Sequence, residues 1–183
     1  MQKGASRGVR ELVYTALASA HIAVSAFITV PLPSAGAITL QSFGVYFALF
    51  LLGGRLGTLA VALYIAIGAV GLPVFSGFTG GVGRLLDASG GFIFGFLLAA
   101  LTYWLTTALF GKRLRLLFAA LSLAVLYASG ALWYSFVYLE AGEAGLSAVL
   151  LTCVLPFVIP DAIKLFLADL VAKRLERIID IKQ

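Results

Sequence analysis

Apolar residues follow one another along this chain in runs that are close to the length needed to cross a lipid bilayer. Glycine, proline and charged residues interrupt the runs between Leu12 and Val171. From the apolar lengths we predict six membrane-spanning helices, at roughly residues 12–30, 38–53, 56–71, 91–110, 116–139 and 146–172. The predicted fold class is therefore all-α: a polytopic integral membrane protein, with a six-transmembrane-helix bundle forming a single domain over residues 1–183.

The composition supports a membrane protein and excludes a soluble one. Of the 183 residues, 62% are hydrophobic and 11% are charged, whereas about a quarter of the residues in soluble domains are charged. The formal net charge of +5 does not indicate a nucleic-acid-binding protein, because the basic residues lie at the ends of apolar runs and form no continuous patch. We therefore expect membrane lipid, and no nucleic acid, as a partner.

The basic residues also indicate the orientation in the membrane. Six spans put both termini on one side, and that side collects Lys3, Arg7, Arg10, Arg55, Lys112, Arg113, Arg115, Lys173, Arg174, Arg177 and Lys182. The opposite loops hold Arg84 together with Asp87, Glu140 and Glu143. The positive-inside rule thus places a short N-terminal segment (1–11) and a C-terminal tail (173–183) in the cytoplasm of a multi-pass protein of the cytoplasmic membrane.

The N-terminal run has some features of a secretory signal. Basic residues precede it, and Ala35-Gly36-Ala37 after it resembles a cleavage site. The apolar run over residues 12–30 is longer than the roughly 7–15 residues of a signal peptide's apolar region. We therefore expect a retained first span.

The connection between the third and fourth spans, Leu72–Gly90, is long and unlike the others. It is rich in glycine, contains the aromatic residues Phe75 and Phe78, and has little charge. Such a segment suits a loop that folds over or into the helix bundle, as a lid does. The alternative is a cluster of surface turns.

Two ionisable residues lie within the sixth span. Asp161 and Lys164 are three residues apart, so on a helix they share a face and can reach each other or one polar ligand. Ionisable groups at membrane depth are costly and usually face a cavity or a partner, which makes this pair a candidate binding site. A self-neutralising structural pair is the alternative. Pro156 and Pro160 favour local irregularity in the helix nearby.

Polar groups on the outer side could complete a binding site. Arg84 is the only basic residue on that side, and it could bind a substrate carboxylate, or pair with Asp87 within the loop. Thr39, Gln41 and Ser42 place neutral hydrogen-bonding groups at the start of the second span, where they could recognise a urea or amide edge. For Thr39, helix capping is an equal alternative.

One face of the fifth span combines aromatic residues with a glycine. Tyr127, Gly130 and Trp133 recur at three-residue steps, and an apolar ring of a ligand could pack against the gap at the glycine. The alternative for Trp133 is a place in the aromatic belt at the membrane interface.

Small residues in the first span permit close approach of another helix. Ala16 and Ala20 make a small-xxx-small step, and the helix that approaches could belong to this bundle or to a separate subunit.

Enzyme chemistry and cofactors are not predicted. His21 is the only histidine and Cys153 the only cysteine, Ser135 lacks a Gly-x-Ser-x-Gly context, and no ATP-binding Gly-x-x-x-x-Gly-Lys sequence occurs. We therefore expect no catalytic residues, no metal site and no cofactor, and ATP hydrolysis only on another chain.

Several blocks of residues, taken together, resemble one family. They are Ala37-Ile38-Thr39-Leu40-Gln41-Ser42-Phe43, Leu51-Leu52-Gly53, Gly68-Ala69-Val70-Gly71-Leu72-Pro73-Val74-Phe75, Thr79-Gly80-Gly81-Val82-Gly83, Ser89-Gly90-Gly91-Phe92 and Ile159-Pro160-Asp161-Ala162-Ile163-Lys164. In order and spacing they resemble the biotin-specific substrate-binding (S) subunits of energy-coupling-factor (ECF) transporters, the BioY family. The chain departs from that pattern at Ala37, where the family often has proline, and at Asp87-Ala88-Ser89-Gly90-Gly91-Phe92, where it has Gly-Pro-Thr-Gly-Gly-Tyr.

The resemblance implies a protein that captures biotin outside the cell and associates with a transmembrane coupling (T) protein and two ATP-binding-cassette ATPases. It also implies that Ala16 and Ala20 form the face that docks on the coupling protein. The alternatives are an S subunit for another vitamin, of riboflavin or thiamine type, a stand-alone facilitator, and a structural membrane subunit.

Overall fold

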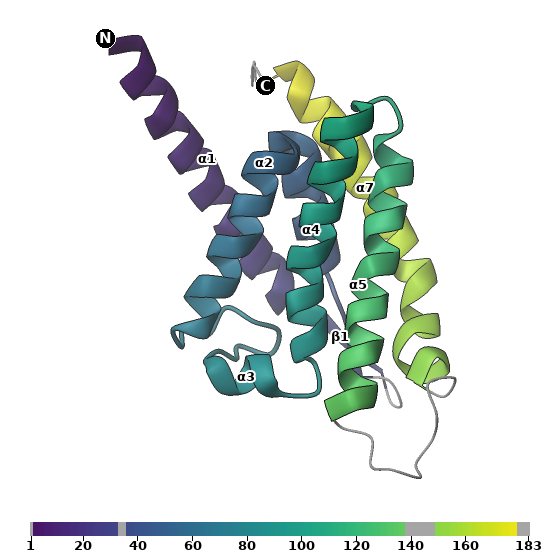
Figure 1. Ribbon diagram of the computed structural model, residues 1–183. Coiled ribbons are helices and arrows are strands. Elements are labelled where there is room, and N and C mark those ends of the chain that lie inside the picture. The colour runs from purple at the N-terminus through teal and green to yellow at the C-terminus, as the bar shows by residue number, and fades with distance from the viewer. Residues whose placement is uncertain (1, 33–35, 138–148, 179–183) are drawn as a thin grey trace.

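The computed structural model describes residues 2–32, 36–137 and 149–178, which form a helix bundle with a small β-hairpin at one end (Figure 1). The elements are α1 (Gln2–Phe27), β1 (Thr29–Leu32), β2 (Gly36–Thr39), α2 (Gln41–Ala69), α3 (Val82–Leu86), α4 (Gly90–Phe110), α5 (Arg115–Val137), the π-helix η1 (Leu150–Val154) and α7 (Leu155–Ile178). The start of α1, the end of α7 and the turn between α4 and α5 lie at one end of the bundle; the hairpin and α3 lie at the other (Figure 1).

The second and third predicted spans are the two arms of α2. Gly53 breaks the helix with φ 79° and ψ 169°, in the left-handed region of φ that favours glycine. Beyond the break the arms pack closely, since a Cβ on Gly57 would lie 2.8 Å from the Cα of Leu49. The expected interruption at Gly53-Gly54-Arg55 is therefore a tight reversal inside one element.

The all-α prediction is wrong at the end of the first span. Residues 29–32 and 36–39 pair as an antiparallel hairpin in which Val30 lies opposite Ile38 and Pro31 opposite Ala37. Thr29, Val30, Ile38 and Thr39 are β-branched and favour extended backbone, and Pro31 cannot continue a helix. The hairpin thus begins where α1 ends, and its second strand leads directly into α2 at Gln41.

Helix α1 packs on α2 through one stripe of residues. Its buried positions Thr15, Ser19, Ile22 and Ala26 recur at helical spacing. The two backbones approach closely at Gly44, where a Cβ would lie 2.8 Å from Ser25 Oγ. The helix begins at Gln2, well before the predicted start at residue 12, because the basic N-terminal residues continue the same helix.

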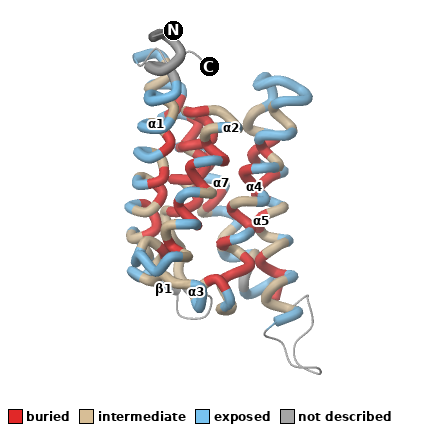
Figure 2. The backbone as a smooth tube through the Cα atoms, turned by 60° about the vertical axis from the view of Figure 1, so that its left-hand side comes forward, coloured by how far each residue is buried: buried red, intermediate tan, exposed pale blue. Residues whose placement is uncertain are grey.

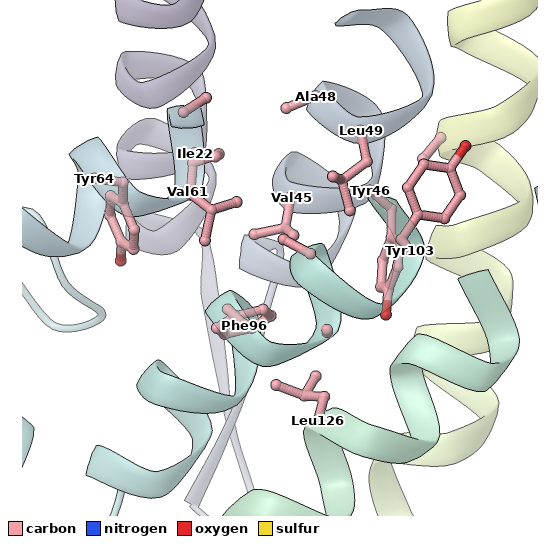
Figure 3. Close-up of a cluster of buried hydrophobic side chains, with 14 of the residues drawn as sticks. Ile22, Val45, Tyr46, Ala48, Leu49, Val61, Tyr64, Phe96, Tyr103 and Leu126 are labelled. Atoms are coloured by element: carbon pink, nitrogen blue, oxygen red, sulfur yellow. The ribbon is translucent and has the colours of Figure 1, made fainter. Parts of the chain in front are cut away.

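The core lies between α1, α2, α4, α5 and α7, and Figure 3 shows part of it. Its side chains include Val45, Tyr46, Leu49, Phe96 and Leu126, all less than a tenth exposed. The outward faces of the helices are exposed (Figure 2), and they carry many large apolar side chains, among them Leu105, Leu109, Phe110, Leu117 and Leu121. An apolar outer surface of this kind is suited to lipid.

Three of the helices that the structure describes are long and apolar enough to cross a membrane: α2, α4 and α5. The fifth and sixth predicted spans include residues 138–139 and 146–148, which lie outside the described residues, as do Glu140 and Glu143. The six-span arrangement therefore stays a prediction.

Candidate functional site

A cavity of about 540 Å³ lies among α2, α4, α5, α7 and the segment that contains α3. This volume is within the range of roughly 300–1,000 Å³ typical of small-molecule sites. Its polar lining consists of Thr39, Gln41, Ser42, Ser76, Arg84, Ser89, Tyr127, Tyr134, Thr152, Asp161 and Lys164, and its apolar lining of Ala37, Phe75, Ala88, Phe92, Ile93, Phe96, Leu126 and Phe157.

Asp161 and Lys164 form the centre of a buried polar network on the cavity wall. Lys164 Nζ donates to Asp161 Oδ1 at 2.7 Å and to the backbone oxygen of Thr39 at 2.7 Å, with a longer contact of 3.4 Å to Ser42 Oγ. Ser42 Oγ donates to Asp161 Oδ1 at 2.8 Å, and Tyr127 OH donates to Asp161 Oδ2 at 2.7 Å. The pair therefore joins α7 to the hairpin, α2 and α5, and holds one carboxylate in a fixed orientation.

A local irregularity of the backbone lies just before α7, the helix that carries Asp161 and Lys164. Sequence analysis placed this irregularity at Pro156 and Pro160, and the structure has it slightly earlier, as the π-helix η1 that includes Thr152. Pro160 itself lies inside the continuous helix. A π-helical turn rotates the residues that precede it, and such turns often occur at functional sites.

Three polar atoms at the cavity are buried without a hydrogen-bond partner among the described residues. They are Gln41 Nε2, Arg84 Nε and Ser89 Oγ. Buried polar groups in proteins are almost always paired, so unpaired ones gathered on one cavity wall indicate donors that a polar ligand would satisfy. The Thr39 hydroxyl, by contrast, accepts a long bond of 3.4 Å from Gln41 N. Thr39 does not cap α2, because the N-cap position is Leu40.

Arg84 and Asp87 form an ion pair at the end of the bundle that holds α3. Arg84 Nη1 lies 2.5 Å from Asp87 Oδ2, and both side chains are partly exposed. The Asp87 backbone oxygen accepts bonds from Trp133 Nε1 at 3.0 Å and from Gly90 N at 2.8 Å. Trp133 is not among the residues that line the cavity. Its bond to the Asp87 backbone oxygen instead anchors the segment that leads into α4.

The segment of residues 72–90 folds against the bundle through its aromatic residues. Phe75 is buried, with its ring edge-on to Tyr64 at 5.5 Å, and it packs on Gly68, where any side chain would collide with the ring. Phe78 stacks on Phe27 of α1 at 4.3 Å but remains two-thirds exposed. Phe75 therefore forms part of the cavity wall, and Phe78 covers the junction with α1.

The gap predicted at Gly130 is filled by the protein itself. A Cβ at this position would collide with the ring of Phe92 from α4. The expected packing of a ligand ring on Gly130 is therefore wrong, because the phenyl ring of Phe92 occupies that place and itself lines the cavity.

Seven of the eight predicted binding residues line the cavity: Asp161, Lys164, Arg84, Gln41, Thr39, Phe75 and Tyr127. Sequence analysis missed Phe92, Ile93 and Phe96 of α4 and Phe157 of α7. The spacing of Phe92 and Phe96 by one helical turn was the available signal, but it does not differ from that of any packed face of an apolar helix.

A second charged cluster lies away from the cavity, between α5 and α7. Asp169 is 1% exposed; its two oxygens accept bonds of 2.6 Å from Arg115 Nε and from Lys173 Nζ. Arg115 also binds Glu176 at 3.0 Å and lies over the ring of Phe50 at 5.4 Å. None of these residues is among those that line the cavity.

Ala16 and Ala20 lie on the exposed side of α1, whereas Thr15 and Ser19 face α2. Packing of the two alanines inside this bundle, one of the two alternatives from the sequence, is therefore wrong. The face is open to lipid or to a separate protein.

Comparison with known proteins relates the chain to biotin transporters. The sequence profile of the BioY family matches residues 1–181. The chain is 36% identical to the biotin transporter BioY of Thermotoga maritima over 171 residues, which cover 93% of this chain and 98% of that protein. It is 35% identical to a probable biotin transporter BioY of Pyrococcus horikoshii over 170 residues, covering 91% and 96%.

A solved structure has the same fold. The crystal structure of the S-component for biotin from an ECF-type ABC transporter matches with a TM-score of 0.82 at 27% sequence identity. The match covers 94% of this chain and 93% of that one.

Proposed function

Because the chain belongs to the BioY family, we propose that its cavity captures biotin for uptake across the membrane, as the S component of an ECF-type transporter. The observation that supports this most directly is the Asp161–Lys164 network on the wall of a cavity of about 540 Å³. The relatives supply the identity of the ligand, and the geometry of this chain suits its chemistry.

Biotin has a cyclic urea with two N–H donors and one carbonyl acceptor, an apolar sulfur ring, and an acyl chain that ends in a carboxylate. Asp161 is a carboxylate that accepts from a urea N–H, and Gln41 Nε2 is an unpartnered donor for a carbonyl. Phe75, Phe92 and Phe96 offer apolar surface for the ring and the chain. Lys164 and Arg84 are the cations among the described lining residues.

Biotin retention by the purified protein tests this function. We expect labelled biotin to remain bound through purification in detergent, and an excess of riboflavin or thiamine to leave it bound. A folded protein that retains no biotin, or that exchanges it for riboflavin or thiamine, would overturn the proposal.

The membrane arrangement that we propose has six spans with both termini in the cytoplasm. In support, the exposed basic residues Lys112, Arg113, Lys173 and Arg174 belong to the end of the bundle where α1 starts and α7 ends (Figure 1). A cysteine placed at Lys112 in a Cys153→Ser background reports the side. Labelling of that cysteine by an impermeant reagent in intact cells would mean that this end of the bundle faces outward, opposite to the orientation we propose.

The exposed alanines suit a docking face for a transmembrane coupling protein, which would act with two ATP-binding-cassette ATPases. Ala16→Trp would hold the two helices apart without touching the cavity, so we expect biotin binding to persist and ATP-driven uptake to fall at least tenfold. Ala16→Ser keeps the residue small and serves as the matched control. Unchanged uptake by Ala16→Trp would contradict docking at this face.

A further inference from the structure

Both cations on the described part of the cavity wall already have a carboxylate of this chain beside them. Lys164 is held by Asp161 at 2.7 Å and by the Thr39 backbone oxygen. Arg84 is held by Asp87 at 2.5 Å. A ligand carboxylate that enters the cavity therefore meets two neutralised pairs and no free positive charge.

We propose that Asp87 is an internal counter-ion for Arg84 that makes the ligand carboxylate dispensable, so that the protein binds biotin amides about as tightly as biotin. This inference rests on the proposed function, because it concerns the same cavity. It assigns Asp87 as a residue that determines specificity for the end of the acyl chain, and it adds neutral biotin amides to the ligands expected.

The position of Asp87 favours this role because the residue is held in place by bonds within the protein and is not among the residues that line the cavity. Its Oδ1 accepts from the backbone N–H of Ala88 at 2.6 Å, and its backbone oxygen accepts from Trp133 and Gly90. Arg84 lines the cavity, whereas Asp87 is not among the lining residues. The carboxylate of Asp87 thus neutralises the charge of Arg84 without itself lining the cavity.

Arg84 still has a donor to offer. Its Nε is buried without a partner among the described residues, so the guanidinium can donate to a ligand oxygen while Nη1 stays on Asp87. An amide oxygen and a carboxylate oxygen both accept such a bond. The carboxylate would gain more than the amide from a net positive charge, and Asp87 offsets that charge.

The size of the effect follows from the exposure of the pair. A charge-assisted hydrogen bond to a buried free arginine would favour a carboxylate over an amide by about ten- to a hundredfold. The side chains of Arg84 and Asp87 are 30% and 43% exposed, and solvent weakens interactions between exposed charges. Without Asp87, Arg84 would therefore favour a carboxylate over an amide by only about three- to tenfold, and this is the preference that Asp87 removes.

Competition binding with biotin and biotinamide on the purified protein tests the proposal. For the parent chain we expect the two dissociation constants to agree within about threefold. Asp87→Asn keeps an acceptor for the Ala88 N–H but removes the charge, so biotin should gain about three- to tenfold over biotinamide. Raised salt should reduce that gain, because the pair is partly exposed.

The double variant Arg84→Gln with Asp87→Asn shows whether Asp87 acts through Arg84. We expect its ratio of the two dissociation constants to return to that of the parent. Asp87→Ser is the second variant to use if Asp87→Asn does not fold. A parent protein that prefers biotin more than about threefold, or an Asp87→Asn ratio equal to the parent's, would overturn the inference. Failure of the parent to bind biotin at all would instead overturn the proposed function.

Discussion

Helix α7 contains two buried aspartates with opposite surroundings. Asp161 accepts from two hydroxyls, of Ser42 and Tyr127, and from one ammonium, on the wall of a cavity. Asp169, eight residues and about 12 Å further along the helix, is held between the two cations Arg115 and Lys173 and is not among the residues that line this cavity. The same residue type at similar burial thus has two hydroxyl groups and one cation as partners in one place, and two cations in the other.

The difference shows how one helix can combine recognition with anchoring. Hydroxyl groups can rotate and share an oxygen with an incoming donor, so a ligand can join the Asp161 network without leaving a charge unpaired. Arg115 ties the start of α5 to Asp169 in the last turns of α7, and Lys173 of α7 binds the same carboxylate. Replacing either cation leaves a buried charge with fewer partners. We therefore expect mutations at Asp161 to change affinity and mutations near Asp169 to change stability.

The largest expected effect is the loss of stability when Arg115 is replaced by methionine. Asp169 would keep Lys173 but lose its better buried partner, which should lower the free energy of unfolding by about 3 kcal/mol. Thermal unfolding in detergent without biotin measures this. Biotin affinity of the folded protein should stay within about twofold, because Arg115 is far along the helix from the cavity residues.

Arg113→Met is the matched control for Arg115. It removes the same charge from the same end of the bundle, but Arg113 is exposed, so we expect a change within about 0.5 kcal/mol. Equal losses for the two variants would mean that net charge, and not the Asp169 cluster, sets the stability of this end.

The next largest effect is on affinity, and it separates the two aspartates directly. Asp161→Asn keeps the size of the side chain but removes the acceptor charge, so we expect biotin to bind about ten- to a hundredfold more weakly. Asp169→Asn should leave affinity within about twofold and lower the melting temperature. Titration of both variants with labelled biotin measures the contrast.

One further variant removes an ambiguity in that contrast. Asp161→Asn alone leaves the Lys164 ammonium without its carboxylate, so part of its effect could arise from strain in the free protein. Asp161→Asn combined with Lys164→Met removes both charges. If this double variant binds biotin as tightly as the parent, the pair is structural and the difference between the two aspartates disappears.

The sequence was sufficient to predict the contact between Asp161 and Lys164, but not the cluster around Asp169. Asp161 and Lys164 stand out because ionisable residues within an apolar span are rare, and three-residue spacing places them on one face. Arg115 was interpreted only as a topology signal at the end of a span. Its partner Asp169 is 54 residues away, and nothing in the spacing of the chain relates the two.

The sequence also predicted one part of the fold, the long apolar helices, but not the strands or the contacts between helices. The apolar runs predicted the positions of α2, α4 and α5, since length and composition alone define a candidate span. The pairing of residues 29–32 with 36–39 was missed because a short apolar stretch next to a helix does not distinguish strand from helix. Contacts such as Phe92 on Gly130 depend on how two helices meet, which one chain's pattern does not specify.

The smallest effect, and the finest test of the Asp161 site, is the change Tyr127→Phe. The ring stays on the cavity wall while the hydroxyl that binds Asp161 Oδ2 at 2.7 Å is lost. A carboxylate oxygen has room for two donors, so Tyr127 and a ligand N–H can bind it together, and the hydroxyl fixes the orientation that the ligand needs. Its loss should weaken biotin binding about three- to tenfold, corresponding to about 1 kcal/mol. Tyr64→Phe is the control: the Tyr64 hydroxyl is buried without a partner among the described residues and lies outside the cavity lining, so affinity should not change. Tighter binding by Tyr127→Phe would mean that the hydroxyl competes with the ligand for Asp161, and that this carboxylate is ordered for the protein's own network and not for biotin.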